Sequence, residues 1–332
     1  MKNWKKFLVM SLACGAILSG STANAAYTLN EEVKDATPAL MTASQIGVLK
    51  YENPNPAMRN AKNKDAIVIL SFGTTYKETR EKTIVATATE IGKAHKNVET
   101  RIAFTSHIVI DHIKENEGTC PFKTPEETIA DLQREGYTRI ALVSFDIIPG
   151  MEYDYAKAIF NQYKDQFKAM TLSTSLIYWQ GQEDQADDAL EFVNAIKDGL
   201  PKVAKDEAVL FMAHGTPHPS NAYYSVINTR LHYAKMKNAY VYTVEGWPQI
   251  DQAVHKLKRL GYKKVLLVPI MMVAGDHANN DMAGDEEDSH KSILEKEGFT
   301  VRAYLHGLGE NKHIQKMFVE RANEAWDALQ GK

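Results

Sequence analysis

The sequence predicts an α/β protein made of two similar halves, each a parallel sheet flanked by helices, with a cleft between them. Three observations lead to this prediction. Short apolar runs alternate with amphipathic helical stretches from residue 65 onward, part of the sequence repeats, and the chain has 332 residues. Apolar runs separated by helices are typical of βαβ units, whose strands are parallel and buried on both faces. A chain of this length accommodates two domains of ordinary size.

Eight apolar runs are the predicted strands. They are Ala66–Ser71, Glu99–Phe104, Arg139–Ser144, Met170–Thr174, Ala208–Met212, Ala239–Val244, Lys264–Pro269 and Thr300–Tyr304. The helices predicted between them cover residues 77–95, 125–135, 152–168, 183–199, 221–236, 249–260 and 284–297. Because parallel neighbours need a long crossover connection, this order of strands and helices favours parallel pairing.

The internal repeat is the strongest sign of the overall organisation. Leu132–Gly150 aligns without gaps onto Leu257–Gly275, and each copy has a helix, a Gly-Tyr turn, a buried strand and an apolar loop that ends in Gly. Earlier in each half, Ala66–Thr75 (AIVILSFGTT) is similar to Ala208–Pro217 (AVLFMAHGTP). Similar units at corresponding places predict two halves of one architecture, with a boundary near residues 175–185.

The chain divides into four parts: residues 1–25, 26–63, 64–180 and 181–332. The last two parts are the two α/β halves. Residues 26–63 are polar and contain Asn53-Pro54-Asn55-Pro56, so we expect an N-terminal arm that is partly helical at best. The net charge is −3 and no run of Lys or Arg suggests a phosphate track, so no nucleic-acid partner is expected.

Residues 1–25 have the pattern of a secretory signal peptide. Lys2, Lys5 and Lys6 precede a short apolar stretch, Phe7–Leu18, and Ala23-Asn24-Ala25 is a small-residue cleavage site. The apolar stretch is shorter than the roughly 20 residues that span a bilayer, so a membrane anchor is disfavoured and the mature form is expected to lack a membrane span. We therefore predict an exported, periplasmic or extracytoplasmic protein, cleaved after Ala25. Lipidation at Cys14 is a second, less favoured interpretation.

Metal-ligand side chains gather where the predicted strands end. In open parallel sheets, ligands bind beyond the carboxyl ends of the strands. The residues of suitable type there are His107, Asp146, Glu152, His214, His218, Glu245, Asp276 and His277. Imidazole and carboxylate suit divalent Co, Ni, Fe or Zn. No HExxH or paired CxxC is present, so a metal site would be assembled from separate strands.

Each of these residues also has a purely structural interpretation. His214 directly follows a buried strand and precedes Gly215, which favours a functional role over a histidine bonded to a backbone carbonyl. Asp146 ends an apolar run, where it either binds a ligand or accepts hydrogen bonds from loop amides. Asp276 is expected to cap the helix that follows it, and the run Asp285–Asp288 to be a solvated helix start.

Other chemistries find little support in the sequence. GxGxxG, GxxxxGK[ST] and GxSxG are absent, which disfavours dinucleotide binding, P-loop nucleotide binding and the hydrolase elbow. Cys120 would be the lone cysteine of the mature chain, and we interpret it as an incidental thiol.

The strand-end segments resemble those of the anaerobic sirohydrochlorin cobaltochelatases of the long, single-chain class II type. The resemblance covers about residues 65–325, in order and with matching spacing. It rests on Ser71–Tyr76 (SFGTTY), Ala103–Ser106 (AFTS), Ile147–Tyr153 (IIPGMEY), Phe211–Gly215 (FMAHG), Val244–Gly246 (VEG), Ala274–Met282 (AGDHANNDM) and Gly307–Asn311 (GLGEN).

The resemblance implies two flavodoxin-like halves and insertion of Co(II) into sirohydrochlorin without ATP, on the anaerobic route to cobalamin. It implies a metal held by His214 and by the position before the Ile-Ile-x-Gly loop, which is His in the family and Asp146 here. His214, Asp146 and Glu245 are then the residues expected to move protons. The macrocycle is expected to contact six further residues: Phe72, Thr74, Ile148, Gly150, Met271 and His277.

Two other functions stay open at this point. Asp146 in place of His, together with the predicted signal peptide, is compatible with a non-catalytic extracytoplasmic protein that binds haem, another tetrapyrrole or a metal. Removal of the metal from haem would use the same site in reverse. The expected partner is in each case a tetrapyrrole, and a homo-oligomer is compatible with the sequence.

Overall fold

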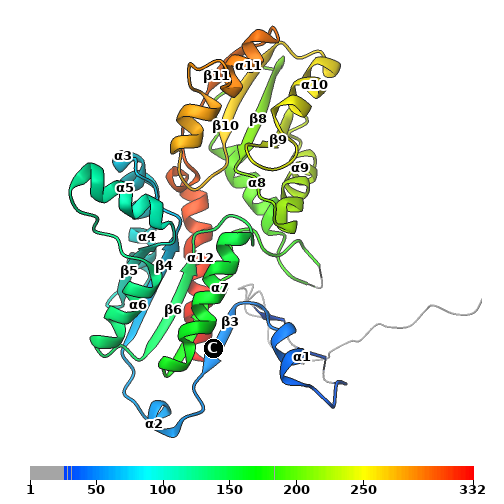
Figure 1. Cartoon of the computed structure of the whole chain (residues 1–332). Helices are drawn as coiled ribbons and strands as arrows, with labels where there is room; N and C mark the ends of the chain where they lie inside the picture. Colours follow the sequence, from blue (N-terminus) through cyan, green and yellow to red (C-terminus); the bar gives the residue numbers. More distant parts are fainter. Residues whose placement is uncertain (1–25, 28, 31, 183) are drawn as a thin grey trace, which may run out of the picture.

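The computed structural model describes residues 26–332 except 28, 31 and 183, so the predicted signal peptide lies outside the described residues. The structure confirms the α/β class. Figure 1 shows two lobes, each with a sheet between helices, and the chain passes from the first to the second after β7. The strands are β1 (Ala26–Tyr27), β2 (Ile46–Gly47), β3 (Leu49–Glu52), β4 (Asp65–Ser71), β5 (Glu99–Phe104), β6 (Arg139–Ser144), β7 (Ala169–Leu172), β8 (Glu207–Ala213), β9 (Ala239–Thr243), β10 (Lys264–Pro269) and β11 (Thr300–Ala303).

The two main sheets have the same strand order, which confirms the two similar halves. The first sheet runs β3-β7-β6-β4-β5 and the second β11-β10-β8-β9. In the first half β4 has β5 on one side and β6 and β7 on the other. In the second half β8 has β9 on one side and β10 and β11 on the other. All these pairs are parallel except β3 with β7. Every residue of β8 is buried, as expected for a central strand covered on both faces.

The N-terminal arm contributes to the first sheet, which the sequence did not predict. β3 pairs antiparallel with the edge strand β7, from Leu49 opposite Leu172 to Glu52 opposite Ala169. Asn53 then fastens the arm, because its side-chain amide donates to the backbone carbonyls of Asp165 and Phe167. A short antiparallel strand added to a parallel sheet is a common way to finish its edge.

The helices follow the prediction in most places and differ in four. Residues 77–94 form α3, a π-helical segment η1 and α4 rather than one regular helix. The predicted helix 284–297 begins only at His290, because Ser289 caps α11 with its hydroxyl and the acidic run before it lies in turns. α5 and α12 were not predicted. The helices are α1 (Pro38–Ala43), α2 (Pro56–Arg59), α3 (Lys77–Arg80), η1 (Glu81–Val85), α4 (Ala86–Ala94), α5 (His107–Glu117), α6 (Pro125–Arg134), α7 (Met151–Tyr163), η2 (Lys164–Gln166), α8 (Asp188–Asp198), η3 (Pro219–Ala222), α9 (Tyr223–Tyr233), α10 (Ile250–Leu260), η4 (Ala278–Met282), α11 (His290–Lys296), η5 (Leu308–Glu310) and α12 (Lys312–Gln330).

The last helix returns to the first half. α12 packs against β6, β7 and α4, although it follows the second half in the sequence, and Figure 1 shows it running down the length of the first lobe. The ring of Phe318 on α12 lies 4.6 Å from that of Phe145, which follows β6. Buried Arg321 of α12 pairs with buried Asp188 at 3.1 Å and donates to Thr174 in the connection between the halves. The division at residue 180 thus leaves one helix of the later part on the earlier sheet.

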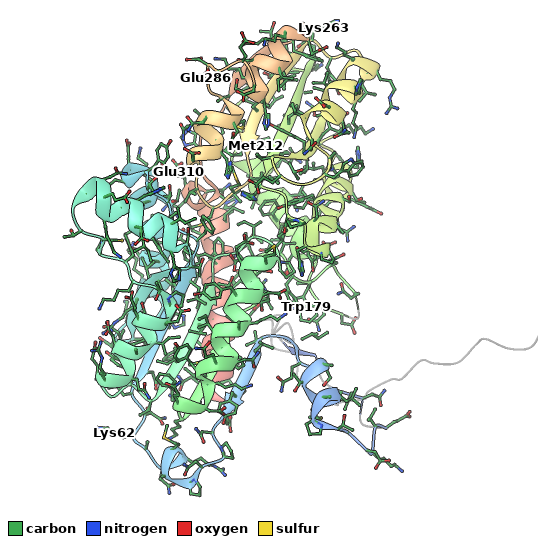
Figure 2. All side chains as sticks on the ribbon, in the orientation of Figure 1. Lys62, Trp179, Met212, Lys263, Glu286 and Glu310 are labelled. Atoms are coloured by element: carbon green, nitrogen blue, oxygen red, sulfur yellow. The ribbon has the colours of Figure 1, made fainter. Side chains whose placement is uncertain are left out.

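The two sheets point their carboxyl ends at each other. In Figure 2, Lys62 before β4 and Lys263 before β10 lie toward opposite ends of the two lobes, while Met212 near the end of β8 lies close to the junction. The loops after the strands therefore meet between the halves. In open α/β sheets this edge carries the ligand, next to the point where the strand order reverses.

Candidate functional site

A cavity of about 300 Å³ lies between the two halves. Its walls come mainly from the loops after β4, β6, β8 and β10. β4 and β6 are neighbours in the first sheet, and β8 and β10 are neighbours in the second. The strand order of each sheet reverses between these neighbours, so the cavity lies at the expected ligand position of both sheets. The lining segments are Ser71–Thr75, Phe145–Ile148 with Gly150 and Glu152, His214–Thr216, Ile270–Val273 and Gly275–His277, with Val109, Tyr224 and Ile227.

The cavity collects most of the residues predicted from the sequence. All six expected macrocycle contacts line it, as do His214 and Asp146. Phe72 leaves half of its surface exposed, so an apolar ring stands at the edge of the cavity. Glu245 follows β9 and lies beside His214, because its backbone N–H donates to the carbonyl of His214 at 2.7 Å.

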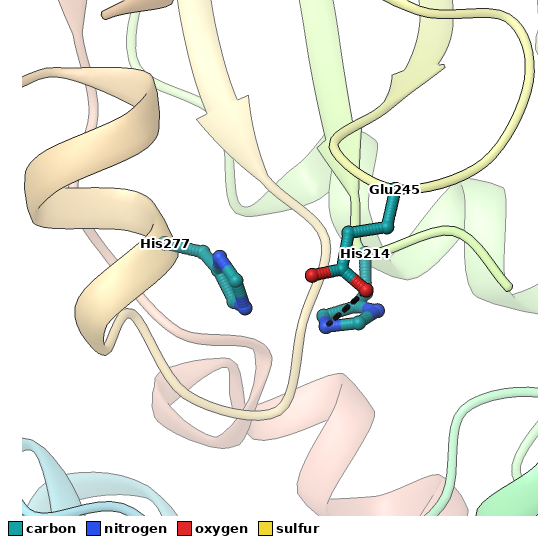
Figure 3. A group of neighbouring side chains, drawn as sticks. All are labelled: His214, Glu245 and His277. Carbon is teal, nitrogen blue, oxygen red and sulfur yellow. Dashed lines mark ion pairs between the residues drawn. The ribbon is translucent and has the colours of Figure 1, made fainter.

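Three donors converge on the wall contributed by the second half. The imidazoles of His214 and His277 and the carboxylate of Glu245 place one ligand atom each within 4.8 Å of the others. Glu245 Oε2 lies 3.9 Å from His214 Nε2, and the two imidazole rings have centroids 4.8 Å apart with their planes nearly perpendicular. Figure 3 shows His277 and His214 pointing toward each other with Glu245 above them. Two imidazoles and a carboxylate suit divalent Co, Ni, Fe or Zn.

Asp146 is not a member of this group. We expected it beside His214 as the second metal ligand, but the second imidazole near His214 is His277, which we had placed among the macrocycle contacts. The reason is topological: Asp146 follows β6 of the first sheet, whereas the three donors follow β8, β9 and β10 of the second. Asp146 thus lines the wall contributed by the first half.

Glycine allows the backbone to carry His214 into this position. Gly215 has φ +89°, and a Cβ there would lie 2.2 Å from the backbone nitrogen of Gly246. The equivalent Gly73 of the first half has φ +95° and would place a Cβ 2.6 Å from the ring of Phe104. Both strands can turn outward only with glycine at these positions. His214 Nδ1 lies 2.8 Å from the carbonyl of Gly215; a carbonyl can only accept, so Nδ1 donates and Nε2 is left as the free nitrogen.

The segment after β10 is held by contacts between residues four apart. Asn280 donates to Asp276 at 2.7 Å, and His277 Nδ1 lies 2.7 Å from Asp281 Oδ2. The amide of Asn279 donates to the carbonyls of Ala274 and Gly275. These contacts replace the simple helix cap that we expected of Asp276. That residue also accepts a 3.4 Å bond from the hydroxyl of Tyr76 in the other half.

The carboxyl of Asp146 is partly buried in the wall of the cavity. Burial raises its pKa to about 7, and the charge of Glu152 acts in the same direction. The hydroxyl of Ser144 donates to Asp146 Oδ2 at 2.6 Å and opposes the rise. A carboxylic acid with a pKa near neutrality exchanges protons far more readily at physiological pH than an ordinary aspartate.

The cavity wall carries few charges to meet an anionic ligand. Apolar side chains such as Ile148, Ile270 and Met272 provide much of the lining, and none of the described lining residues is Lys or Arg. The lining thus favours an apolar ligand and offers an acidic group no Lys or Arg among the described lining residues.

The remaining candidates lie outside the group of donors. His107 opens α5 and is exposed, and His112 is exposed on the same helix. His218 accepts from the backbone N–H of Ser220 and places Nε2 3.4 Å from Asp154 on α7. It therefore contributes to a contact between the two halves. Cys120 is a partly exposed free thiol. No helix of the described part of the chain is long and apolar enough to cross a membrane.

Two similar α/β halves around a cavity, with a group of possible metal donors on one wall, are an arrangement that suits a chelatase. A solved structure described as SirB from Bacillus subtilis with Fe3+ shares this fold with a TM-score of 0.53 at 16% identity, covering 81% of this chain and 98% of that one. The chain belongs to the cobalt chelatase (CbiK) family, whose profile matches residues 65–327. A sirohydrochlorin cobaltochelatase of Salmonella typhimurium is 33% identical over 262 residues, which are 79% of this chain and 96% of that protein. The sirohydrochlorin cobaltochelatase CbiKC of Nitratidesulfovibrio vulgaris is 29% identical over 272 residues, 80% and 92% of the two chains.

Proposed function

We propose that the protein inserts Co(II) into sirohydrochlorin without ATP, and that it does so outside the cytoplasm. The observation that carries the reaction is the group of His214, Glu245 and His277 on one wall of an apolar cavity whose other wall holds Asp146. The names of the relatives in Salmonella typhimurium and Nitratidesulfovibrio vulgaris support the substrate and the metal.

The two walls have different tasks in this proposal. His214, Glu245 and His277 replace water on the incoming metal ion, since imidazole and carboxylate bind Co(II) readily but leave exchangeable positions. The macrocycle lies between the walls, with apolar contacts from side chains such as Ile148 and Met271. The metal then reaches the pyrrole nitrogens from the side of the second half.

Protons leave from the other face of the macrocycle. Two pyrrole N–H protons are lost as one dication enters, so the net charge of the macrocycle does not change. Asp146 faces the cavity from the first half, and with its pKa near 7 its carboxylate is a suitable first acceptor. The proton can pass to bulk water by way of Glu152, which lines the same wall and is exposed.

A chelation assay tests the reaction. The mature chain is mixed anaerobically with sirohydrochlorin and Co(II), and insertion is followed by absorbance above the spontaneous rate. We expect turnover in the native protein, loss of turnover in His214→Ala and His277→Ala, and no change in His112→Ala, whose side chain is exposed outside the cavity. Absence of turnover combined with tight binding of haem would refute the proposal in favour of a tetrapyrrole-binding protein. Release of iron from haem would instead identify a dechelatase.

The proposed location rests on the N-terminal pattern of Lys2, Lys5, Lys6, the apolar stretch and Ala23-Asn24-Ala25. Mass spectrometry of the protein from a periplasmic extract tests it. We expect a mature chain that begins at Ala26, and a full-length chain confined to the cytoplasmic fraction would contradict export.

A further inference from the structure

We propose that Asp281 is a positioning residue that holds His277 in the tautomer able to bind the metal. This inference rests on the proposed function and extends it to a residue outside the group of donors. His277 Nδ1 lies 2.7 Å from Asp281 Oδ2. A carboxylate can only accept, so Nδ1 must carry the proton and donate it. His277 Nε2 is then the nitrogen with a free lone pair.

The ring of His277 has the orientation that this tautomer requires. In Figure 3 it extends from its helical segment toward His214, with the nitrogen remote from its Cβ leading. The hydrogen bond to Asp281 is made by Nδ1, the ring nitrogen next to the carbon that carries Cβ, which leaves Nε2 free. A carboxylate behind a metal-binding imidazole both fixes the ring and increases the basicity of its free nitrogen, since it stabilises the proton on the other nitrogen.

The local backbone brings the two side chains together. Ala278–Met282 form the π-helical segment η4, and His277 stands directly before it. Single π-helical turns inside or beside helices are frequent at functional sites because they change the direction of a side chain by part of a turn. Here the turn places Asp281 beside a residue four positions earlier, within one self-contained segment.

In the part of the chain that the structure describes, the ion pairing of Asp281 stays within its own segment. Among the described residues, His277 is the only basic side chain paired with it. It is also not buried among apolar groups, because its side chain keeps 44% of its surface exposed. A contribution to folding alone would therefore be small, whereas the contact with His277 is short and direct.

Asn280 provides a matched control in the same segment. Its side chain makes the same kind of contact, a 2.7 Å hydrogen bond to Asp276 four residues earlier, but it does not touch a metal donor. Asn280→Ala therefore loosens this segment without changing the partner of His277. A merely structural role of Asp281 would give the two variants similar behaviour.

The first measurement is made on metal-free protein labelled with ¹⁵N in its histidines. Long-range ¹H–¹⁵N correlation spectra report which imidazole nitrogen carries the proton. We expect His277 in the Nδ1–H form in the native protein and in Asn280→Ala, and a shift toward the Nε2–H form in Asp281→Ala. His277 in the Nε2–H form in the native protein would overturn the inference, whether or not the protein inserts cobalt.

The second measurement is the affinity for Co(II) alone, by calorimetric titration together with the visible spectrum of the bound ion. Loss of such a partner typically weakens metal binding about 10- to 100-fold. We expect a loss of that size in Asp281→Ala, partial recovery in Asp281→Glu, and native affinity in Asn280→Ala. Native affinity in Asp281→Ala, or equal losses in the alanine variants of Asp281 and Asn280, would refute the positioning role. A native protein that binds no Co(II) would refute the proposed function. The tautomer measurement would still decide whether Asp281 fixes the protonated nitrogen of His277.

Discussion

Replacing Asp146 by asparagine should make the protein more stable at neutral and higher pH and should lower its activity. In the folded protein the pKa of this carboxyl is about 7, against 3.8 for an ordinary aspartate such as that of the unfolded chain. The folded chain therefore holds the proton more tightly than the unfolded chain between these values. Protonation of Asp146 therefore stabilises the folded state. This stabilisation is fully present below about pH 4 and is lost as the pH rises toward 7.

The size of the effect follows from the two pKa values. One pH unit between them corresponds to about 1.4 kcal/mol, so the whole interval amounts to about 4 kcal/mol. Asp146→Asn removes the ionisation, while its amide oxygen can still accept from Ser144. We expect the variant to match the native protein near pH 4 and to be more stable by about 4 kcal/mol at pH 8.

Urea unfolding at a series of pH values from 4 to 8 measures this difference, and Asp111→Asn on the exposed face of α5 serves as the control. Asp146→Asn should also remove the proton acceptor on this wall, so we expect chelation to slow by about 100-fold or more. A stability difference that does not change with pH, or an asparagine variant that is less stable at pH 8, would refute the reasoning about the buried carboxyl.

Three further predictions concern the site and its frame. Gly215→Ala should destabilise the protein by more than about 3 kcal/mol, because the new Cβ meets the backbone of Gly246, whereas Gly118→Ala, with φ +76° and open space around it, should cost about 1 kcal/mol in thermal unfolding. Arg321→Leu should cost about 3–5 kcal/mol in chemical unfolding because it leaves buried Asp188 without its cation; an unchanged midpoint would show that this pair does not connect the halves. His277→Ala should weaken Co(II) binding by more than about 100-fold in a calorimetric titration, and native affinity would remove His277 from the group of donors.

The repeated pattern of the sequence was sufficient to predict the general architecture. Apolar runs such as Ala66–Ser71 and Ala208–Met212 correspond to central strands β4 and β8, since a strand buried on both faces has to be apolar throughout. β3 was missed because Leu49–Glu52 is short and only partly buried, and its place is set by an open sheet edge rather than by its own pattern. The amphipathic pattern of a helix shows that one face is buried but not which sheet covers it. The return of α12 to the first half therefore has no signal in the sequence.

The site was predictable in its outline but not in its grouping. The rule that ligands bind at the carboxyl ends of strands led to His214, Glu245 and Asp146, each close to the end of its strand, and it also included His277 among the residues of suitable type. His277 is several residues beyond the end of β10, and only the turn of the segment that follows brings its ring back to His214. Distances across the cavity depend on how two separate sheets face each other. For this reason the sequence could not show whether Asp146 comes close enough to His214 to share a metal ion with it.

The return of α12 sets the order in which the molecule can be completed. The helix that covers β6 and β7 is encoded by the last residues of the chain, so a ribosome releases the whole second half before the first sheet can hide that face. The first half therefore cannot bury this face of its sheet until the second half has been synthesised. Once α12 docks, it covers β6 and β7 of the first half, and its Arg321 joins that sheet to Asp188 at the start of α8 in the second half.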